Sequence, residues 1–171
     1  MDRSSKPNRA DVHSPAVRSY NMSRVRGRDT LPEMLIRKGL HSRGHRFRLQ
    51  SRELPGRPDL VFPRRHAVVF VHGCFWHGHS CPLFRQPATR PEFWLSKIES
   101  NRARDARATE KLSALGWRRL IVWECSLRGP SRRPIDAVLD SCEAFLTGTA
   151  SAAEITGQWP RFDSTSRERI E

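Results

Sequence analysis

The chain has 171 residues, a length that suits one domain with terminal extensions and allows a buried hydrophobic core. Its formal charge of +13 is typical of a nucleic-acid-binding protein, because Lys and Arg neutralise phosphates; a generally cationic surface is the alternative. No apolar run approaches the roughly 20 residues of a membrane span, and the N-terminus lacks an apolar secretory segment, so we expect a cytoplasmic protein. Its four cysteines are then more typical of thiols or metal ligands than of disulfides.

The predicted elements alternate between helices and strands. Residues 1–20 form a polar, basic segment that we expect to be flexible, residues 21–148 a folded domain, and residues 149–171 a variable tail without a clear pattern. A first helix is predicted over 30–44, with Thr30 as N-cap and Glu33 at capping-box spacing. Strands are predicted at 45–50, 60–63, 66–73 and 117–125, a turn at 53–59, and further helices at 91–115 and 134–146. This order predicts an α/β fold with a mixed β-sheet flanked by helices.

The helix expected at 91–115 carries polar residues within its inward stripe. Steps of four and three connect Trp94, Ile98, Asn101, Asp105, Ala108, Leu112 and Leu115. An unpaired polar side chain on a buried face is costly, so Asn101 and Asp105 should have partners. In the last predicted helix, Cys142 falls on the apolar face and is expected to pack in the core.

The stretch VHGCFWHGHSC, residues 71–81, combines cysteines, histidines and adjacent aromatic residues. Cys74, His79 and Cys81 lie close together in it, and Cys125 ends the last predicted strand. Three thiolates and one imidazole suit a closed tetrahedral zinc site, although the C-x4-H-x-C spacing is not that of a standard zinc finger. Unrelated buried thiols are the alternative. The spacing leaves open whether His72, His77 or His79 binds the metal.

Asp59 follows a tight Pro-Gly-Arg-Pro turn at the start of a buried strand. Many nucleases hold a carboxylate at such a position, where it binds Mg²⁺ next to the scissile phosphate. The alternative is that Asp59 serves only as a turn residue or a strand cap. A histidine of the nearby loop could accept a proton from water that attacks phosphorus. A buried carboxylate such as Asp105 could fix the tautomer of that histidine.

Five motifs give the chain a resemblance to a known family. They are RSYNMSRVRGRDT (18–30), PGRPD (55–59), HGCFWH (72–77), PATR-EFW-KI within 87–98, and LGWRRLIVWEC-LRG (115–129). Over about residues 15–148 the chain resembles the very-short-patch repair DNA mismatch endonucleases. The resemblance implies a restriction-endonuclease-like fold, a structural zinc and a magnesium-dependent active site. It also implies nicking of one DNA strand 5′ of the thymine in a T·G mismatch, the product of 5-methylcytosine deamination.

The resemblance also assigns roles to residues. It implies zinc ligands at Cys74, His79, Cys81 and Cys125, catalysis by His77 with support from Asp105, and magnesium bound by Asp59 and the backbone carbonyl of Val71. Glu33 matches an acidic residue of the family's active site, although the capping box also explains it. In DNA binding, Phe75, Trp76 and Trp94 would wedge into the duplex, with Met22 in the opposite groove and Lys97, Asn101, Glu124 and Arg128 near the DNA or the active site. Core packing is the alternative for Trp94.

The implied partners are mismatched double-stranded DNA, downstream mismatch-repair proteins and a repair polymerase, with the chain itself a monomer. Two alternatives stay open on the residues alone: a non-catalytic zinc-stabilised DNA-binding module, and a restriction-like nuclease without mismatch preference. The chain departs from the family at Gly78 and Ser80, where histidine is frequent, and at Val71, where threonine is frequent. Because the implied magnesium ligand at Val71 is its backbone carbonyl, valine in place of threonine should not affect metal binding.

Overall fold

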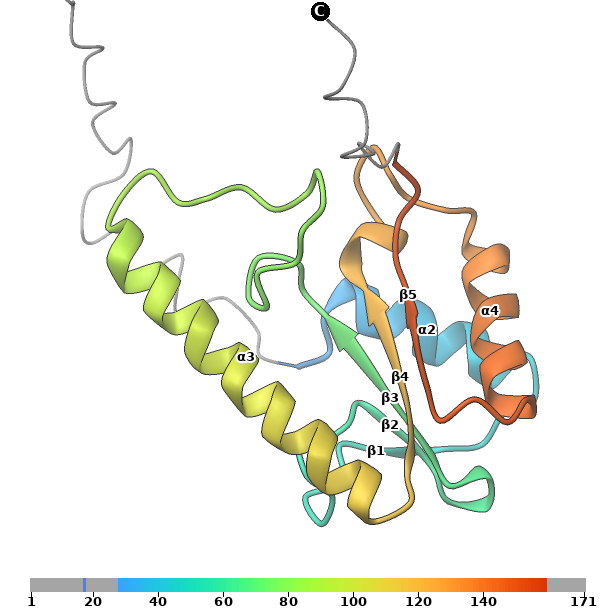
Figure 1. The fold of residues 1–171 in the computed structure, drawn as a ribbon. Helices are drawn as coiled ribbons and strands as arrows, with labels where there is room; N and C mark the ends of the chain where they lie inside the picture. The colour runs from blue at the N-terminus through green and yellow to red at the C-terminus, as the bar shows by residue number, and fades with distance from the viewer. Residues whose placement is uncertain (1–16, 18–27, 160–171) are drawn as a thin grey trace, which may run out of the picture.

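The computed structural model describes residue 17 and residues 28–159. In that part of the chain, one sheet holds five strands in the order β1-β2-β3-β4-β5. The first three strands pair antiparallel, whereas β3–β4 and β4–β5 are parallel. The strands are β1 (Arg48–Leu49), β2 (Leu60–Phe62), β3 (Ala67–His72), β4 (Arg118–Trp123) and β5 (Ala152–Ile155) (Figure 1). The predicted mixed sheet of an α/β fold is confirmed.

Three long helices flank the sheet: α2 (Leu31–Ser42), α3 (Pro91–Ala114) and α4 (Ile135–Thr147), and the short helices η1 (Pro63–Arg65) and η2 (Glu124–Ser126) follow β2 and β4. Thr30 is the N-cap of α2 as predicted, because its hydroxyl oxygen accepts from the Glu33 N–H at 3.5 Å. In return, the Glu33 carboxylate accepts from the Thr30 hydroxyl and from the Asp29 N–H, each at 2.9 Å. As predicted, α3 begins at Pro91, and the left-handed Gly116 (φ +75°) follows its end. Among the described residues no helix is both long and apolar enough to cross a membrane.

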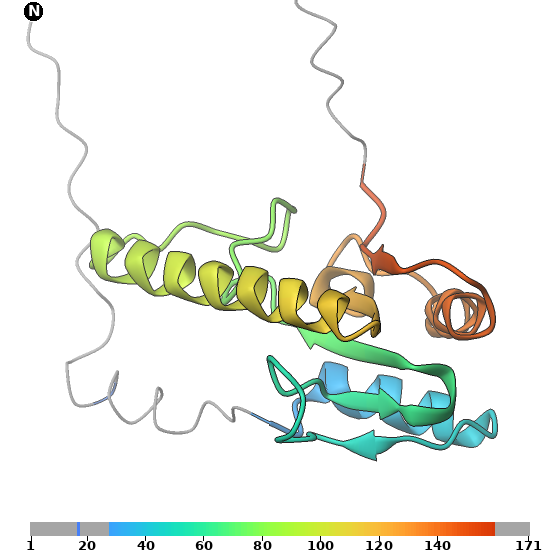
Figure 2. The same ribbon diagram turned by 60° about the horizontal axis from the view of Figure 1, so that its bottom comes forward.

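Alternate residues of the strands enter two separate cores, one on each face of the sheet. On one face, Leu60, Val69 and Leu120 pack with the apolar sides of α2 and α4. On the other, Val68 and Ile121 pack with Leu112 of α3. Figure 2 shows α3 on its own side of the sheet. Burial on both faces explains why the central strands are almost entirely apolar.

The structure differs from the predicted elements at three places. Residues 152–155, in the segment expected as a variable tail, form β5, which pairs with β4 although only Ile155 is a large apolar residue. The strand predicted at 45–50 is reduced to the two-residue edge strand β1, because Gln50 adopts a left-handed backbone (φ +45°) and ends the pairing. Leu115, expected on the inward stripe, is 55% exposed because α3 ends one residue before it.

Candidate active site and metal cluster

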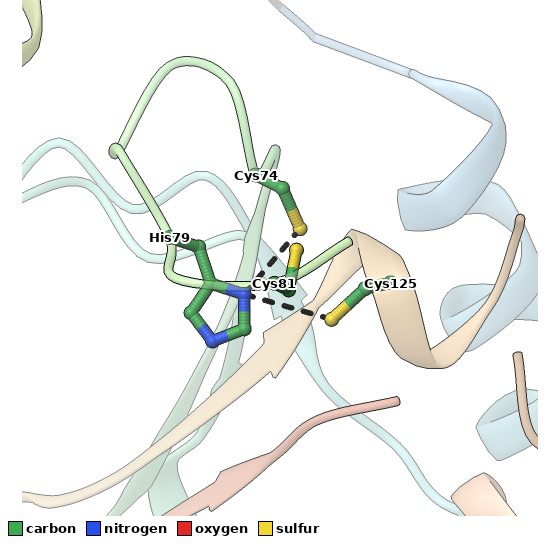
Figure 3. A group of neighbouring side chains, drawn as sticks. All are labelled: Cys74, His79, Cys81 and Cys125. Carbon is green, nitrogen blue, oxygen red and sulfur yellow. Dashed lines mark hydrogen bonds between the residues drawn. The ribbon is translucent and has the colours of Figure 1, made fainter. Parts of the chain in front are cut away.

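Cys74, His79, Cys81 and Cys125 lie together at the end of the two central strands (Figure 3). The parallel register pairs His72 with Trp123, so the segments that follow β3 and β4 leave the same edge of the sheet. The potential ligand atoms all lie within 4.8 Å of one another, and His79 Nδ1 is 3.7 Å from Cys74 Sγ and 3.6 Å from Cys125 Sγ. A tetrahedral ion with bonds of about 2.3 Å to sulfur and about 2.0 Å to nitrogen holds those atoms about 3.6 Å apart. The cluster therefore fits a metal ion.

The side chains of Cys74 and Cys125 are hydrogen-bonded to each other. Hydrogen bonding from the Cys74 thiol, assisted by the N–H of Gly157, lowers the pKa of Cys125 to about 6, and the same pairing raises the pKa of Cys74. Only one of the two thiols is thus favoured as an anion. A cation bound between them favours the thiolate form of each cysteine, so metal binding and proton release are linked.

The segment that follows β5 packs against the cysteine–histidine cluster. The Gly157 N–H donates to Cys125 Sγ at 3.3 Å, and a Cβ at this glycine would lie only 2.4 Å from the Cys125 carbonyl oxygen. The His79 ring stacks on Trp123 at 4.0 Å, and the Trp159 ring meets it edge-on at 5.9 Å. A residue other than glycine at 157 therefore could not make this close approach without a shift of the backbone.

His77 and Asp105 form a pair beside the metal cluster. The side chains come from the loop after β3 and from the middle of α3, and His77 Nδ1 lies 2.5 Å from Asp105 Oδ2. One turn earlier on α3, the Asn101 side-chain amide donates to the Trp76 carbonyl oxygen at 2.9 Å. The prediction that both polar residues of the stripe have partners is confirmed.

His72 is a member of this site that the sequence reasoning did not assign. Its ring stacks on that of His77, with centroids 3.9 Å apart and an interplanar angle of 4°. The side chain is buried, and burial lowers the pKa of His72 to about 3, so its imidazole is neutral at physiological pH. A histidine at the end of an otherwise apolar strand was the available signal, but only the structure shows the stacking.

Asp59 lies near His77. Its Oδ2 accepts a hydrogen bond of 2.8 Å from the backbone N–H of Val71. Burial, and next the negative charge of Glu33, raise the pKa of Asp59 to about 6, against the opposing effects of the Val71 N–H and of Arg37. A partly desolvated carboxylate of this kind favours a nearby cation. The structure thus places Asp59 beside Val71.

An open cleft of about 590 Å³ is lined by some of the expected catalytic and DNA-binding residues, although Asp59 and Asp105 are not part of its lining. Its lining includes Glu33, Val71, Trp76, His77, Glu124 and Arg128. Arg128 is 61% exposed and pairs with Glu124 at 3.0 Å, and a second Glu124 oxygen accepts from the Cys74 N–H. Glu124 therefore links the rim of the cleft to the loop that carries the metal cluster.

Glu33 is held by its neighbours as well as by the helix terminus. Arg37, one turn later in α2, donates to Glu33 at 3.1 Å and also pairs with Asp29. The Arg37 side chain is 8% exposed, so this cation is buried among carboxylates. The i,i+4 spacing of Glu33 and Arg37 was a weak signal for the pair in the sequence. Glu33 borders the cleft, but its oxygens are already engaged in these contacts.

Phe75, Trp76 and Trp94 form one aromatic cluster between the metal-binding loop and the start of α3. Their ring centroids are 5.2 to 5.9 Å apart, in edge-to-face arrangements, and all three side chains are half-buried. Lys97, one turn further along α3, is exposed. Met22 lies outside the described residues. The structure thus places Trp94 with the loop aromatics rather than in the central core.

Comparison with known proteins agrees with this arrangement. The family model for "DNA mismatch endonuclease Vsr" matches residues 10–83. The DNA mismatch endonuclease Vsr of Escherichia coli (strain K12) is 48% identical over 149 residues, which cover 87% of this chain and 96% of that protein. The type II nicking enzyme V.XorIIP of Xanthomonas oryzae pv. oryzae is 54% identical over 117 residues, which cover 68% of this chain and 86% of that protein.

Fold and site together define an α/β protein in which imidazole and carboxylate groups lie beside a cysteine–histidine cluster that could hold a metal ion, at one edge of a mixed sheet. The extent of the match to the E. coli protein then identifies the family. The chain belongs to the DNA mismatch endonuclease Vsr family.

Proposed function

We propose that this protein is an endonuclease that nicks one strand of duplex DNA 5′ of the thymine in a T·G mismatch. The observation that carries the proposal is the His77–Asp105 pair, 2.5 Å apart, on the cleft that Val71 and Glu33 also line. Membership of the mismatch endonuclease family supports both the DNA substrate and the endonuclease class. The net charge of +13 suits a polyanionic substrate.

In this proposal His77 is the general base. Asp105 accepts from the Nδ1–H of His77 and so leaves Nε2 free to take a proton from the attacking water. The stacked, neutral His72 holds the plane of the His77 ring without adding a second positive charge. Because Asp105 sits on a long helix and His77 on the metal-binding loop, the pair requires that both elements keep their relative position.

Asp59 and the carbonyl of Val71 would hold Mg²⁺. Glu33, which lines the cleft, would be a further catalytic carboxylate, with a role only as the cap of α2 as the alternative. When bound, the ion supplies charge stabilisation for the phosphate under attack. The hydrogen bond from the Val71 N–H holds the half-buried Asp59 carboxylate beside β3.

Cys74, His79, Cys81 and Cys125 would hold zinc, whose preference for a closed set of sulfur and nitrogen ligands matches the cluster. His77 lies between two of these ligands in the sequence, so a fixed loop also fixes the base. The site is therefore preorganised by the four ligands without their taking part in the reaction.

For recognition, Phe75, Trp76 and Trp94 would enter the duplex beside the mismatch, with Met22 in the opposite groove. Flat rings can replace lost base stacking, and a mismatched step opens at lower cost than a paired one. Lys97, Asn101 and Arg128 would contact the DNA around the cleft. We further propose a cytoplasmic monomer that passes its nicked product to mismatch-repair proteins and a repair polymerase.

A strand-resolved cleavage assay tests the proposal. Duplexes that differ only in T·G or C·G at one position, with randomised flanks, are incubated with Mg²⁺ and either wild-type protein or the Asp59→Ala and His77→Ala variants. We expect a nick 5′ of the mismatched thymine by the wild type alone. Cleavage of both duplexes would instead indicate a restriction-like nuclease, and binding without cleavage would indicate a DNA-binding module.

A further inference from the structure

A second hollow, of about 510 Å³, lies at the end of the sheet opposite to the candidate active site. Its walls are residues 44–48, which follow α2, and residues 62–65, which lead from β2 into η1. Phe62 pairs with Ala67, the first residue of β3, whereas His72 ends that six-residue strand. The hollow and the active-site edge are therefore about 17 Å apart along β3, at the 3.3 Å rise of a strand. Figure 1 shows the turn after β2 and the loop after β3 at opposite ends.

The walls of this arginine-lined hollow are strongly cationic. They carry four exposed arginines, Arg46, Arg48, Arg64 and Arg65. Within residues 28–159 none of the four forms an ion pair. Their close spacing without counter-charges is unfavourable, and an anionic ligand would relieve it.

The neighbouring carboxylates cannot neutralise these arginines because they are already engaged. Every acidic side chain of α4 contacts Arg43, with distances of 3.0 Å to Asp136, 2.6 Å to Asp140 and 2.7 Å to Glu143. Glu143 also accepts from His45 at 2.8 Å. The fold thus satisfies Arg43 and leaves the arginines of the hollow available.

The half-buried Phe47 ring forms an apolar floor of the hollow, and Phe62, which packs against it, is only 2% exposed. The Phe47 and Phe62 rings pack at 5.6 Å, and the His45 ring meets Phe62 edge-on at 6.3 Å. The Arg65 side chain is anchored by donation to the Leu146 carbonyl oxygen at 3.2 Å, whereas the guanidinium groups of Arg48 and Arg64 make no hydrogen bond within the described part of the chain. Two guanidinium groups are therefore free to bind a ligand above an aromatic floor.

We propose that the arginine-lined hollow docks an acidic segment of a partner protein, with an apolar side chain of that segment on the Phe47 floor. Guanidinium forks match carboxylates in bidentate geometry, which accounts for Arg48 and Arg64. Charge complementarity selects an acidic ligand, and the apolar floor selects a peptide over a phosphate backbone, which has no group to place there. DNA in the active-site cleft would lie at the other end of the strands and leave the hollow accessible.

The test measures binding of a fluorescein-labelled peptide of aspartates with one phenylalanine, by anisotropy at low salt. Wild type is compared with Arg48→Gln/Arg64→Gln, and with Arg107→Gln/Lys111→Gln, which removes the same charge from exposed positions on α3. We expect about tenfold weaker peptide binding for the first variant and little change for the second, as for the loss of two partly exposed ion pairs. Replacing the phenylalanine of the peptide by serine should also weaken binding to wild type.

A T·G duplex is titrated into the same three proteins. The proposal expects equal duplex affinity for the two variants, because each has lost two charges. It is overturned if wild type does not bind the peptide, or if both variants lose peptide binding equally, which would indicate general attraction to a cationic surface. A selective loss of duplex affinity in Arg48→Gln/Arg64→Gln would overturn it in favour of a DNA-binding surface. Thermal unfolding of each variant confirms that the comparison is made on folded protein.

Discussion

At the scale of single residues, the contact between His77 and Asp105 is the most direct target. Asp105→Asn replaces the charged carboxylate by a neutral amide, whose NH2 group can donate to His77 Nδ1 and so favour the wrong tautomer, yet the side chain keeps its size and place on α3. We expect single-turnover nicking of a T·G duplex to fall by about 10²- to 10⁴-fold, with duplex affinity unchanged. Nicking within a few-fold of wild type would show that Asp105 serves only to pack the helix.

The negative charge of Asp59 is expected to lower the stability of the folded protein at neutral pH, because burial disfavours the ionised carboxylate. The pKa of its carboxyl is about 6 in the folded protein and 3.8 as an ordinary carboxyl, so the folded state binds the proton more tightly. The stability that this proton contributes is present below about pH 4 and is lost as the pH rises through 6. We therefore expect Asp59→Asn to raise the free energy of unfolding at pH 7.5 by roughly 1–2 kcal/mol, and to have little effect at pH 4.

The measurement is urea unfolding of wild type and Asp59→Asn in magnesium-free buffer at both pH values. A chelator is omitted so that the cysteine cluster keeps any metal it holds. Added Mg²⁺ should stabilise wild type more than the variant. A variant less stable than wild type at pH 7.5 would contradict the expected sign.

At the scale of elements, the sequence predicted correctly those features that depend on residues close together in the chain. Helix α3 was predicted to within one residue because Pro91 and Gly116 frame it, and the cysteine–histidine cluster was predicted because three members are adjacent in the chain. Strand β5 was missed because its sequence AAEI has almost no apolar alternation, and its place depends on pairing with β4. His72 and Arg37 were not assigned because their roles depend on contacts, a stacked ring and a buried ion pair, rather than on spacing alone.

The segment after β5 offers a prediction at this scale. Gly157→Ala places a Cβ within about 2.4 Å of the Cys125 carbonyl oxygen, so the segment must move away and the N–H contact to Cys125 Sγ is lost. We expect about tenfold faster loss of bound metal to a chromogenic chelator, as for other lost contacts to a metal ligand. Gln158→Ala, at an exposed neighbour, is the matched control and should behave as wild type. Equal metal retention in both variants would rule out this supporting role.

At the scale of the whole molecule, the metal cluster connects the loop after β3 to the segment after β4. Removing the metal should therefore lower the thermal unfolding midpoint and abolish nicking together, although none of the four ligands is proposed to touch the substrate. Circular dichroism melting and nicking are measured before chelation, after it, and after Zn²⁺ is added back. Nicking that survives complete metal removal would separate the cluster from the active site.

The parallel pairing of β3 with β4 also has a consequence for the order of folding. The antiparallel β2–β3 pair needs only a short turn, whereas β4 can join β3 only after the whole of α3 has crossed the sheet. His79 and Cys125, 46 residues apart, meet through that late closure, and so do the elements that carry His77 and Asp105. A nascent or partly unfolded chain can thus hold the β2–β3 hairpin before His77 and Asp105 have been brought together.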